Sequence, residues 1–251
     1  MYTLRMLQNE WIKLIKKPSS LMMGIILIAL VAALAGGTAY FAEDTTFWGF
    51  TRNASTLYAV TILFSIIAAG SSVASEFSNG TIKLLLIRPV RRGRILIAKF
   101  LVVFLYGVML LLILAAASIL IGGIFFGFES IYINDVNRLY DLAETYLLYS
   151  GELMTYAAMA FMISTVFRSS SLAIGLSIFL MFTGPQMTML AGRYEWAKYI
   201  IFANTNLTQF KEGTVLFEET TLGFSLTVLA VYLIIFAVVS WQVFQRRDVA
   251  V

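Results

Sequence analysis

Long uninterrupted runs of apolar residues alternate with short polar stretches along the 251-residue chain. A helix needs about 20 apolar residues to cross the hydrocarbon core of a bilayer. Six runs reach that length, namely residues 19–42, 54–75, 95–128, 146–167, 171–190 and 222–244. Because the apolar residues are continuous and do not alternate with polar ones, they predict helices and not the strands of a barrel. We therefore predict an all-α membrane protein whose six transmembrane helices form a single domain over residues 1–251.

The third run is too long for one straight crossing. Its first part, up to Lys99, is expected to lie in the cytoplasmic interface, with the crossing starting near Phe100.

Residues 1–17 predict an amphipathic helix that lies in the membrane interface. Its basic side carries Arg5, Lys13, Lys16 and Lys17, and Pro18 is expected to end it. Two interpretations stay open, a plain anchor or a helix that also contacts a cytoplasmic partner. The apolar residues fall within about 100° of arc; they are Leu4, Leu7, Trp11, Leu14 and Ile15.

Composition narrows the class of protein. Hydrophobic residues make up 60% of the chain and charged residues 13%, against roughly 25% charged residues in an average soluble domain. A soluble globular or disordered protein is therefore excluded. The absence of histidine and cysteine excludes disulfides, the usual Cys/His zinc sites, cysteine nucleophiles and a Ser-His-Asp triad.

The distribution of charge predicts the orientation. With the N-terminus inside, 13 of the 18 Lys and Arg residues, but only 3 of the 14 acids, fall on the cytoplasmic side, as the positive-inside rule requires. The net charge of +4 is then mainly a topology signal, and we expect no nucleic-acid binding. Because apolar character continues past Ala33-Leu34-Ala35 to Ala42, the first run is expected to stay as a span and not to be cleaved as a signal peptide.

The most distinctive polar stretch lies between the second and third runs, at residues 76–94. Asn79-Gly80 predicts a turn, Thr81 can cap a short helix, and Pro89 disfavours its continuation. Residues 82–87 are apolar apart from Lys83. This predicted helix is too short to span, so it must bury its leucines in the interface, among the spans or in another protein.

The residues of this loop resemble those of a known family. Glu76, Gly80-Thr81, Leu84–Leu86, Pro89, Arg91-Arg92 and Lys99 are similar to the pattern in the permease subunits of type-2 class ABC exporters. The resemblance covers the whole chain, with its amphipathic start, six spans and cytoplasmic termini. In that family the loop is a coupling helix that docks on a separate ATPase. The resemblance implies docking by Glu76, Asn79, Gly80, Thr81, Lys83, Leu84, Leu85, Arg88, Pro89 and Arg91.

The resemblance also implies the partners. They are two copies of an ABC ATPase subunit and a second permease chain in the lipid bilayer, with the first and fifth spans near the seam. A homodimer is favoured and a heterodimer stays open. The chain contains no Gly-x-x-x-x-Gly-Lys-Ser/Thr phosphate loop, so no cofactor is expected on this chain, and ATP and Mg²⁺ would bind the partner. The implied location is the plasma membrane of a bacterium.

Three positions are candidates for the outer mouth or path. Glu152 is the one carboxylate expected within a span, where a charge is functional by default, although a solvated position at the outer end is the alternative. Gly184-Pro185 predicts a kink or break in the fifth run, with the freed carbonyls lining a path or bonded by neighbouring helices. Residues 192–221 are aromatic and apolar enough to predict a short re-entrant or interfacial helix, or an aromatic anchor.

The expected function is ATP-driven export of an amphipathic or hydrophobic substrate, such as a peptide, drug or lipid. Within the family, cytolytic or antimicrobial peptides are favoured, and sodium extrusion stays open. The alternative is an ion-coupled secondary transporter, which would use a buried carboxylate such as Glu152 or broken helices. An intramembrane enzyme is disfavoured, because the sequence lacks histidines, paired intramembrane aspartates and Gly-x-Ser-x-Gly.

Overall fold

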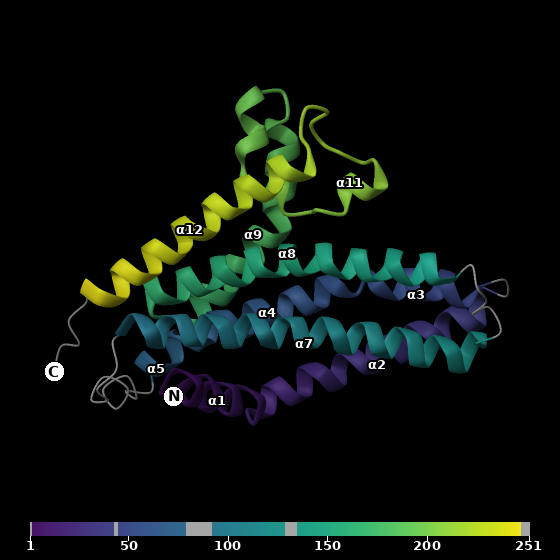
Figure 1. Cartoon of the computed structure of the whole chain (residues 1–251), viewed down its shortest axis with the longest axis horizontal. Coiled ribbons are helices and arrows are strands. Elements are labelled where there is room, and N and C mark those ends of the chain that lie inside the picture. The colour runs from purple at the N-terminus through teal and green to yellow at the C-terminus, as the bar shows by residue number, and fades with distance from the viewer. Residues whose placement is uncertain (1, 43–44, 79–91, 129–134, 247–251) are drawn as a thin grey trace.

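The computed structural model describes residues 2–42, 45–78, 92–128 and 135–246. Throughout these ranges the regular structure is helical, and no strand occurs in them (Figure 1). The helices are α1 (Tyr2–Ile15), α2 (Pro18–Phe41), α3 (Phe47–Ser55), α4 (Tyr58–Ser72), α5 (Ala74–Ser78), α7 (Arg92–Phe126), α8 (Asp135–Phe167), α9 (Ser170–Ala191), the 3-10 helix η1 (Glu195–Tyr199), α10 (Ile201–Asn204), α11 (Gln209–Glu212) and α12 (Leu222–Arg246).

Five helical segments are long and apolar enough to cross a membrane: α2, the joined α3–α5 segment, α7, α9 and α12. Their positions agree with five of the six predicted runs. This is the architecture of a multi-pass membrane protein. The remaining predicted run, residues 146–167, lies in the second half of α8, which does not reach the same apolar character; a sixth crossing therefore stays a prediction.

The lower apolarity of α8 has a structural reason. The helix packs against α4, α7, α9 and α12, and Leu153, Tyr156, Ala157 and Ala160 on it are buried in the largest hydrophobic cluster. A helix surrounded by protein can carry more small and polar residues than a helix that faces lipid. By contrast, only 17% of the apolar stretches of α2 and α12 and 22% of that of α9 is buried. Among the long helices, the one with the weakest apolar signal is thus packed against four others.

The amphipathic start forms α1, which ends before Pro18 opens α2. Trp11 and Leu14 pack against the hydrophobic cluster of α2, α4 and α7, and Arg5, Lys16 and Lys17 are exposed. Helix α1 contacts the beginning of α7, on the same side of the molecule as α5 (Figure 1). The predicted separation of apolar and basic faces is therefore present.

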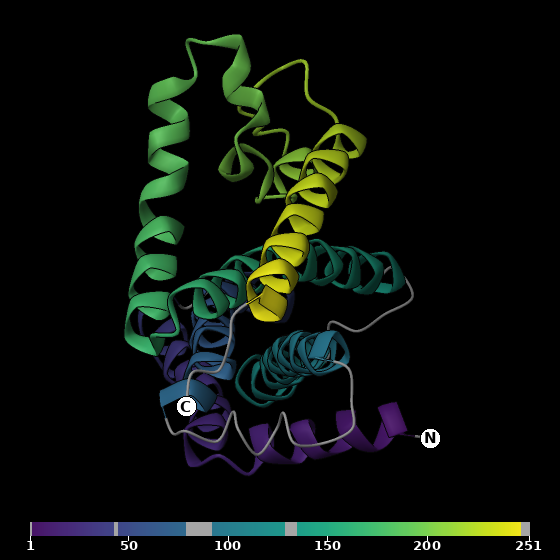
Figure 2. The same ribbon diagram turned by 90° about the vertical axis from the view of Figure 1, so that its left-hand side faces the viewer.

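Helices α9 and α12 diverge from the rest of the bundle, and residues 192–221, which we call the outer segment after their predicted location, lie between their far ends (Figure 2). Where one short helix was expected, residues 195–212 form three, η1, α10 and α11. Hydrogen bonds hold them in place: the Asn204 amide donates to the Lys198 and Ile200 carbonyls, at 2.8 and 3.0 Å, and Ser225 of α12 donates to the Asn204 amide oxygen at 2.7 Å. The Lys211 ammonium lies 2.7 Å from Asp141 of α8.

Of the kink or break predicted at Gly184-Pro185, the break is wrong, since α9 runs without interruption from Ser170 to Ala191, and a kink stays a prediction. Proline removes a backbone donor, but hydroxyl groups in a membrane helix can bond backbone carbonyls near it. The Thr183 hydroxyl donates to the Phe179 carbonyl at 2.7 Å, and the Thr188 hydroxyl donates to the Gly184 carbonyl at 2.9 Å. These local bonds accompany a continuous helix.

Candidate coupling site

Four charged side chains from three helices meet at the two ends of the predicted coupling loop. The Lys99 ammonium on α7 donates to the Glu10 carboxylate on α1 at 2.8 Å and to the Glu76 carboxylate on α5 at 3.1 Å. Lys13, one turn along α1, lies 3.2 Å from Glu10 and 3.6 Å from Glu76. The two cations and two anions form what we call the ion-pair network. It joins residues up to 89 positions apart in the sequence.

Three of the four side chains in the network are largely buried, so their pairing matters for stability. The Lys99 side chain is 6% exposed, and those of Glu10 and Glu76 are 10% and 14% exposed, whereas that of Lys13 is 55% exposed. Removing one partner of a buried ion pair leaves an uncompensated charge, which costs about 3–5 kcal/mol. An exposed pair contributes about 1 kcal/mol or less. Lys99 is therefore the member on which the arrangement depends most.

A polar crevice of about 110 Å³ opens beside the network. The hydroxyl-bearing residues Ser71, Ser72 and Ser75 line it together with the charged residues and Lys17. A cavity of this size and polarity can hold water molecules bound to several polar groups. Water there would solvate the exposed edge of the network without separating the ammonium of Lys99 from its two carboxylates.

The segment that carries Glu76 is held by a second set of bonds. The helix breaks at Val73 between α4 and α5, which leaves backbone groups without a partner in the helix. The Ser164 hydroxyl of α8 donates to the Gly70 carbonyl at 2.7 Å and accepts from the Ala74 amide at 3.1 Å. One buried hydroxyl thus joins the two sides of the break and fixes where α5 begins.

An aromatic contact holds the other side of α5. Arg168 follows α8 in a left-handed conformation, with a φ of 55°, and its guanidinium carbon lies 4.5 Å from the centre of the Phe77 ring. Such a cation–π contact contributes about 0.5–2 kcal/mol, depending on how far water is excluded. Helix α5 is therefore bound to α1 and α7 through Glu76 and to the end of α8 through Phe77.

Of the predicted docking residues, the structure describes Glu76. The others, Asn79, Gly80, Thr81, Lys83, Leu84, Leu85, Arg88, Pro89 and Arg91, lie outside the described residues. The predicted coupling helix therefore stays a prediction. The structure does describe α5, which precedes the predicted coupling helix, and α7, which follows it. The Glu76–Lys99 contact joins these two helices.

The second candidate, Glu152, lies on α8 in a different environment. It is 8% exposed, so the alternative that its carboxyl is solvated is wrong. Tyr58 of α4 lies beside its carboxyl group, and the Tyr58 ring stacks on Tyr149 with centroids 3.8 Å apart. Within the described ranges, no Lys or Arg pairs with Glu152. It lies 15 residues before the end of α8, about 22 Å along the helix.

Gly184, the third candidate, has a packing role. A methyl group at its Cα would lie 2.5 Å from the Phe202 ring of α10, closer than atoms can approach. The absence of a side chain at Gly184 therefore lets the outer segment rest against α9. Pro185 follows it inside the continuous helix.

Comparison with known proteins agrees with a membrane protein. The family model described as "Protein of unknown function (DUF2705)" matches residues 19–250, which include every candidate residue except those of α1. The chain belongs to the DUF2705 family. The matched region contains Glu76, Lys99 and Glu152, whereas Glu10 and Lys13 precede it.

Two relatives of this DUF2705 chain come from Bacillus subtilis (strain 168). "Uncharacterized protein YhcI" is 44% identical over 218 residues, which cover 82% of this chain and 70% of the relative. "Uncharacterized membrane protein YdbK" is 31% identical over 215 residues, which cover 83% of this chain and 85% of the relative. The second name agrees with the apolar helices.

Sequence reasoning missed Glu10 and Lys13 as site residues. A signal was present, because Glu10 lies three residues after Leu7 and four before Leu14, at the edge of the apolar face. It is also one of only three acids that the predicted topology places inside, with Glu76 and Asp248. An acid in that position on a basic, membrane-facing helix suggests a cationic partner nearby.

Proposed function

We propose that this chain is the membrane-spanning permease subunit of an ATP-driven ABC exporter of the type-2 class. It works with two copies of a separate ATPase subunit and with a second permease chain, in the favoured case an identical one. It crosses the plasma membrane of a bacterium six times, with both termini in the cytoplasm. ATP and Mg²⁺ bind the partner ATPase, and no residue of this chain performs chemistry.

One observation carries the proposal: the ion-pair network sits at the base of the loop whose sequence resembles a coupling helix. The Lys99 ammonium contacts both Glu76, before the loop, and Glu10, on the amphipathic helix. A force applied to the loop by a moving ATPase therefore reaches α1, α5 and α7 through one group. A loosely tethered loop would dissipate that displacement before it reached the spans.

The mechanism follows from this connection. ATP binding brings the two ATPase subunits together and carries the docked loops with them. The contacts of α5 with Lys99, Ser164 and Arg168 pass the movement to α7 and α8. The rotation of these helices opens the path toward the outside, where α10 and α11 cover the outer ends of the spans.

The exposure of the outer helices supports a second copy beside this one. Less than a quarter of the apolar stretch is buried in α2 and in α9, which correspond to the first and fifth predicted runs. In the proposed dimer these helices face the seam. The substrate, an amphipathic or hydrophobic molecule such as a cytolytic or antimicrobial peptide, would pass between the two copies.

The test of the proposal is coupling to an ATPase through the loop. The chain is co-expressed with the ATPase subunits encoded beside it, and complex formation and vanadate-sensitive ATPase activity in proteoliposomes are measured. Leu85→Asp places a charge in the apolar part of the loop, so we expect loss of the complex and of the coupled activity. The matched control is Leu216→Asp, at an exposed leucine of the outer segment.

Two results would count against the exporter. One is the absence of any ATPase that binds the chain with Leu85 intact. The other is full coupling in Leu85→Asp, which would place the docking surface elsewhere.

Burial of Glu152 among tyrosines favours a second candidate, an ion-coupled secondary transporter. A carboxyl without a cationic partner inside a bundle is a feature of ion and proton pathways. Export by whole cells separates the two candidates. The exporter stops when ATP is depleted and the ion gradients are maintained, whereas the secondary transporter stops when an ionophore collapses the gradient at constant ATP.

A further inference from the structure

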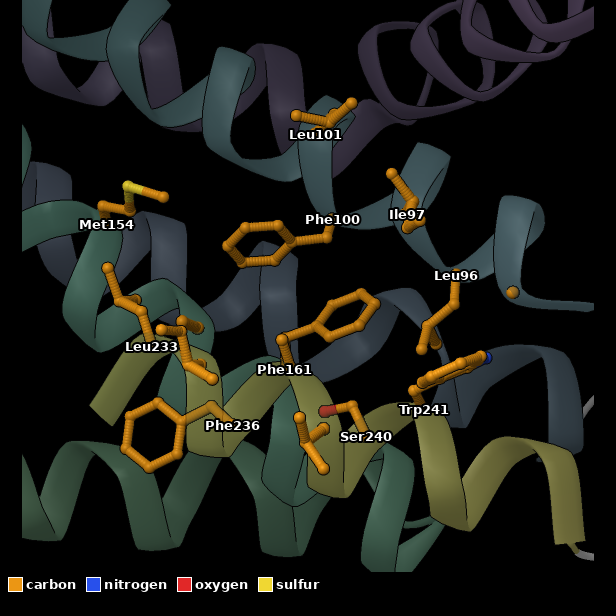
Figure 3. A pocket seen from close by; sticks show the side chains of 15 residues that line it. Leu96, Ile97, Phe100, Leu101, Met154, Phe161, Leu233, Phe236, Ser240 and Trp241 are labelled. Atoms are coloured by element: carbon orange, nitrogen blue, oxygen red, sulfur yellow. The ribbon is translucent and has the colours of Figure 1, made fainter. Parts of the chain in front are cut away.

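Helices α7, α8 and α12 enclose an apolar cavity of about 490 Å³ (Figure 3). Its floor consists of side chains that are at most 5% exposed, among them Leu96, Ala158 and Phe161. Its rim is open, with Ile97 61% exposed and Ile234 62% exposed. The volume lies within the range of about 300–1,000 Å³ that is usual for ligand pockets. The cavity therefore opens sideways, toward the medium that surrounds the spans.

The cavity is elongated along the helices and has one polar end. It runs from Gly93 to Leu101 on α7 and from Leu233 to Trp241 on α12, about 12 Å along each helix. Gly93 is the second residue of α7, and Trp241 lies near the end of α12. The proposed orientation places this end at the cytoplasmic face, where tryptophan is favoured, and the other end deeper in the hydrocarbon.

Trp241 leaves a hydrogen-bond donor at the polar end. A methyl group on Gly93 would lie 2.9 Å from the indole nitrogen, so the glycine lets the indole approach the first turn of α7. In the part of the chain that the structure describes, the Trp241 N–H has no acceptor. Tryptophan normally satisfies this donor when one edge of the ring is buried.

Positive charge is concentrated at the same end. Helix α7 opens with Arg92-Gly93-Arg94, and Arg94 is exposed. Helix α12 ends at Arg246 on the same side. Basic residues around a gap between transmembrane helices on the cytoplasmic side attract anionic lipid headgroups. An occupant that suits the whole site has an apolar chain and an anionic head.

We propose that this cavity binds one acyl chain of an anionic phospholipid from the cytoplasmic leaflet, with its phosphate near Arg94 and the Trp241 N–H. The proposal uses the orientation assigned above but not the exporter activity. The acyl chain fills the space beside Phe100 and Phe161, whose rings meet edge to face with centroids 5.5 Å apart. The lipid joins α12 to α7 and α8 where their side chains leave a gap.

Fluorescence of Trp241 tests the site in the full chain without any ATPase. Trp11, Trp48 and Trp196 are replaced by Phe, and the chain is placed in phosphatidylcholine nanodiscs. Phosphatidylglycerol with brominated acyl chains is then added. We expect saturable quenching, half-maximal at a mole fraction about fivefold lower than for brominated phosphatidylcholine, since one nearby arginine favours an anionic headgroup by roughly that factor.

Two pairs of variants sharpen this test. Ala237→Phe narrows the cavity at an exposed position of α12, whereas Ala230→Phe adds the same ring to an exposed position two turns away that does not line it. We expect saturable quenching to be lost only in Ala237→Phe. Arg94→Gln should abolish most of the preference for the anionic lipid, and Arg5→Gln on α1 should leave it unchanged.

Because replacing three tryptophans can disturb folding, native mass spectrometry of the unaltered chain provides a second measurement. It should detect retained phosphatidylglycerol that Ala237→Phe loses and Ala230→Phe keeps. Quenching proportional to the bulk mole fraction of either lipid would overturn the proposal. So would protection of Trp241 from all brominated lipid together with cross-links between its copies, because the cavity would then be an interface between two chains.

Discussion

Two buried glutamates on this chain, Glu10 and Glu152, have opposite surroundings. Glu10 lies 2.8 Å from the Lys99 ammonium and 3.2 Å from that of Lys13. Glu152 is equally buried, at 8% exposure against 9%, but its neighbours are tyrosine side chains, and among the described residues no cation pairs with it. The same side chain is therefore used in two ways.

The difference shows what each carboxyl contributes. A paired carboxylate stabilises the arrangement of the helices that supply its cations, and its loss leaves those cations buried without a partner. An unpaired carboxyl in a low-dielectric interior lowers stability when it is ionised, so its retention calls for a reason other than stability. The ion-pair network is therefore a structural connection between helices. In the proposed exporter we assign it a mechanical role and assign Glu152 to the path.

Replacing Lys99 by Met should have the largest effect on this comparison. The change keeps most of the length of the side chain but removes the cation that lies between Glu10 and Glu76, so we expect a loss of about 3–5 kcal/mol in the free energy of unfolding. Denaturation in mixed detergent micelles measures it. Lys13→Met is the control, because its side chain is 55% exposed, and it should cost about 1 kcal/mol or less. Equal losses in both variants would contradict the central place of Lys99.

Matched Glu→Gln changes test the contrast directly. Glu10→Gln keeps the shape of the side chain but weakens two bonds to ammonium groups, so we expect a loss of about 2–3 kcal/mol. Glu152→Gln removes an unpaired acid, and we expect a change within about 1 kcal/mol of zero, or a gain. The same unfolding assay compares them.

Transport then separates the roles of the two glutamates. We expect Glu152→Gln to alter the range of exported substrates while the protein remains folded. If Glu152→Gln leaves both stability and export unchanged, its assignment to the path is wrong.

The contact between Arg168 and Phe77 should have a smaller effect. Phe77→Leu retains most of the apolar contact but removes the ring face that the guanidinium covers, so we expect a loss of about 0.5–2 kcal/mol. In the proposed exporter, ATPase coupling should weaken as well, because α5 loses its bond to the end of α8. Phe125→Leu, at an exposed position near the far end of α7, is the control. Coupling that is equally weak in the control would argue against a specific role for Phe77.

The smallest effect is expected for the exposed pair in the outer segment. The hydrogen bond from Lys198 lowers the pKa of Glu219 below its usual value, with the two groups 2.8 Å apart. Stability from this pair is present at neutral pH and is lost as the pH falls through the lowered pKa. When the free energy of unfolding is measured against pH, Lys198→Gln should therefore reduce only the fall in stability on the acid side. If Lys198→Gln lost as much unfolding free energy at neutral pH as Lys99→Met, solvent exposure would not explain how much each ion pair contributes to stability.

The local sequence predicted the positions of the helices well, but it predicted poorly the interactions between them. The apolar runs 171–190 and 222–244 correspond to α9 at Ser170–Ala191 and α12 at Leu222–Arg246, because the length of a span follows from the thickness of the bilayer. The run 54–75 did not predict the break at Val73, where a hydroxyl of α8 bonds backbone groups 90 and 94 positions away in the sequence. Nor did Gly184-Pro185 produce the expected break.

For the candidate site, the sequence indicated Glu76 and Lys99 through their positions at the ends of one loop. It did not indicate that Glu10 joins them, because the partners come from helices whose relative placement is a property of the whole bundle. Glu152 was recognised as unusual from its position in an apolar run. Its burial became visible only in the fold, where α4 and α8 place Tyr58 and Tyr149 around it.

By itself, the sequence determined that this chain is helical and membrane-embedded, and its charges predict which side faces the cytoplasm. These properties depend on short-range quantities, the length of each apolar run and the sign of the charges beside it. Only the tertiary structure decided which buried charges are paired and which helices pack against one another. Pairing at 2.8 Å between Lys99 and Glu10 requires α1 and α7 to lie side by side, and helix packing over many residues sets that distance.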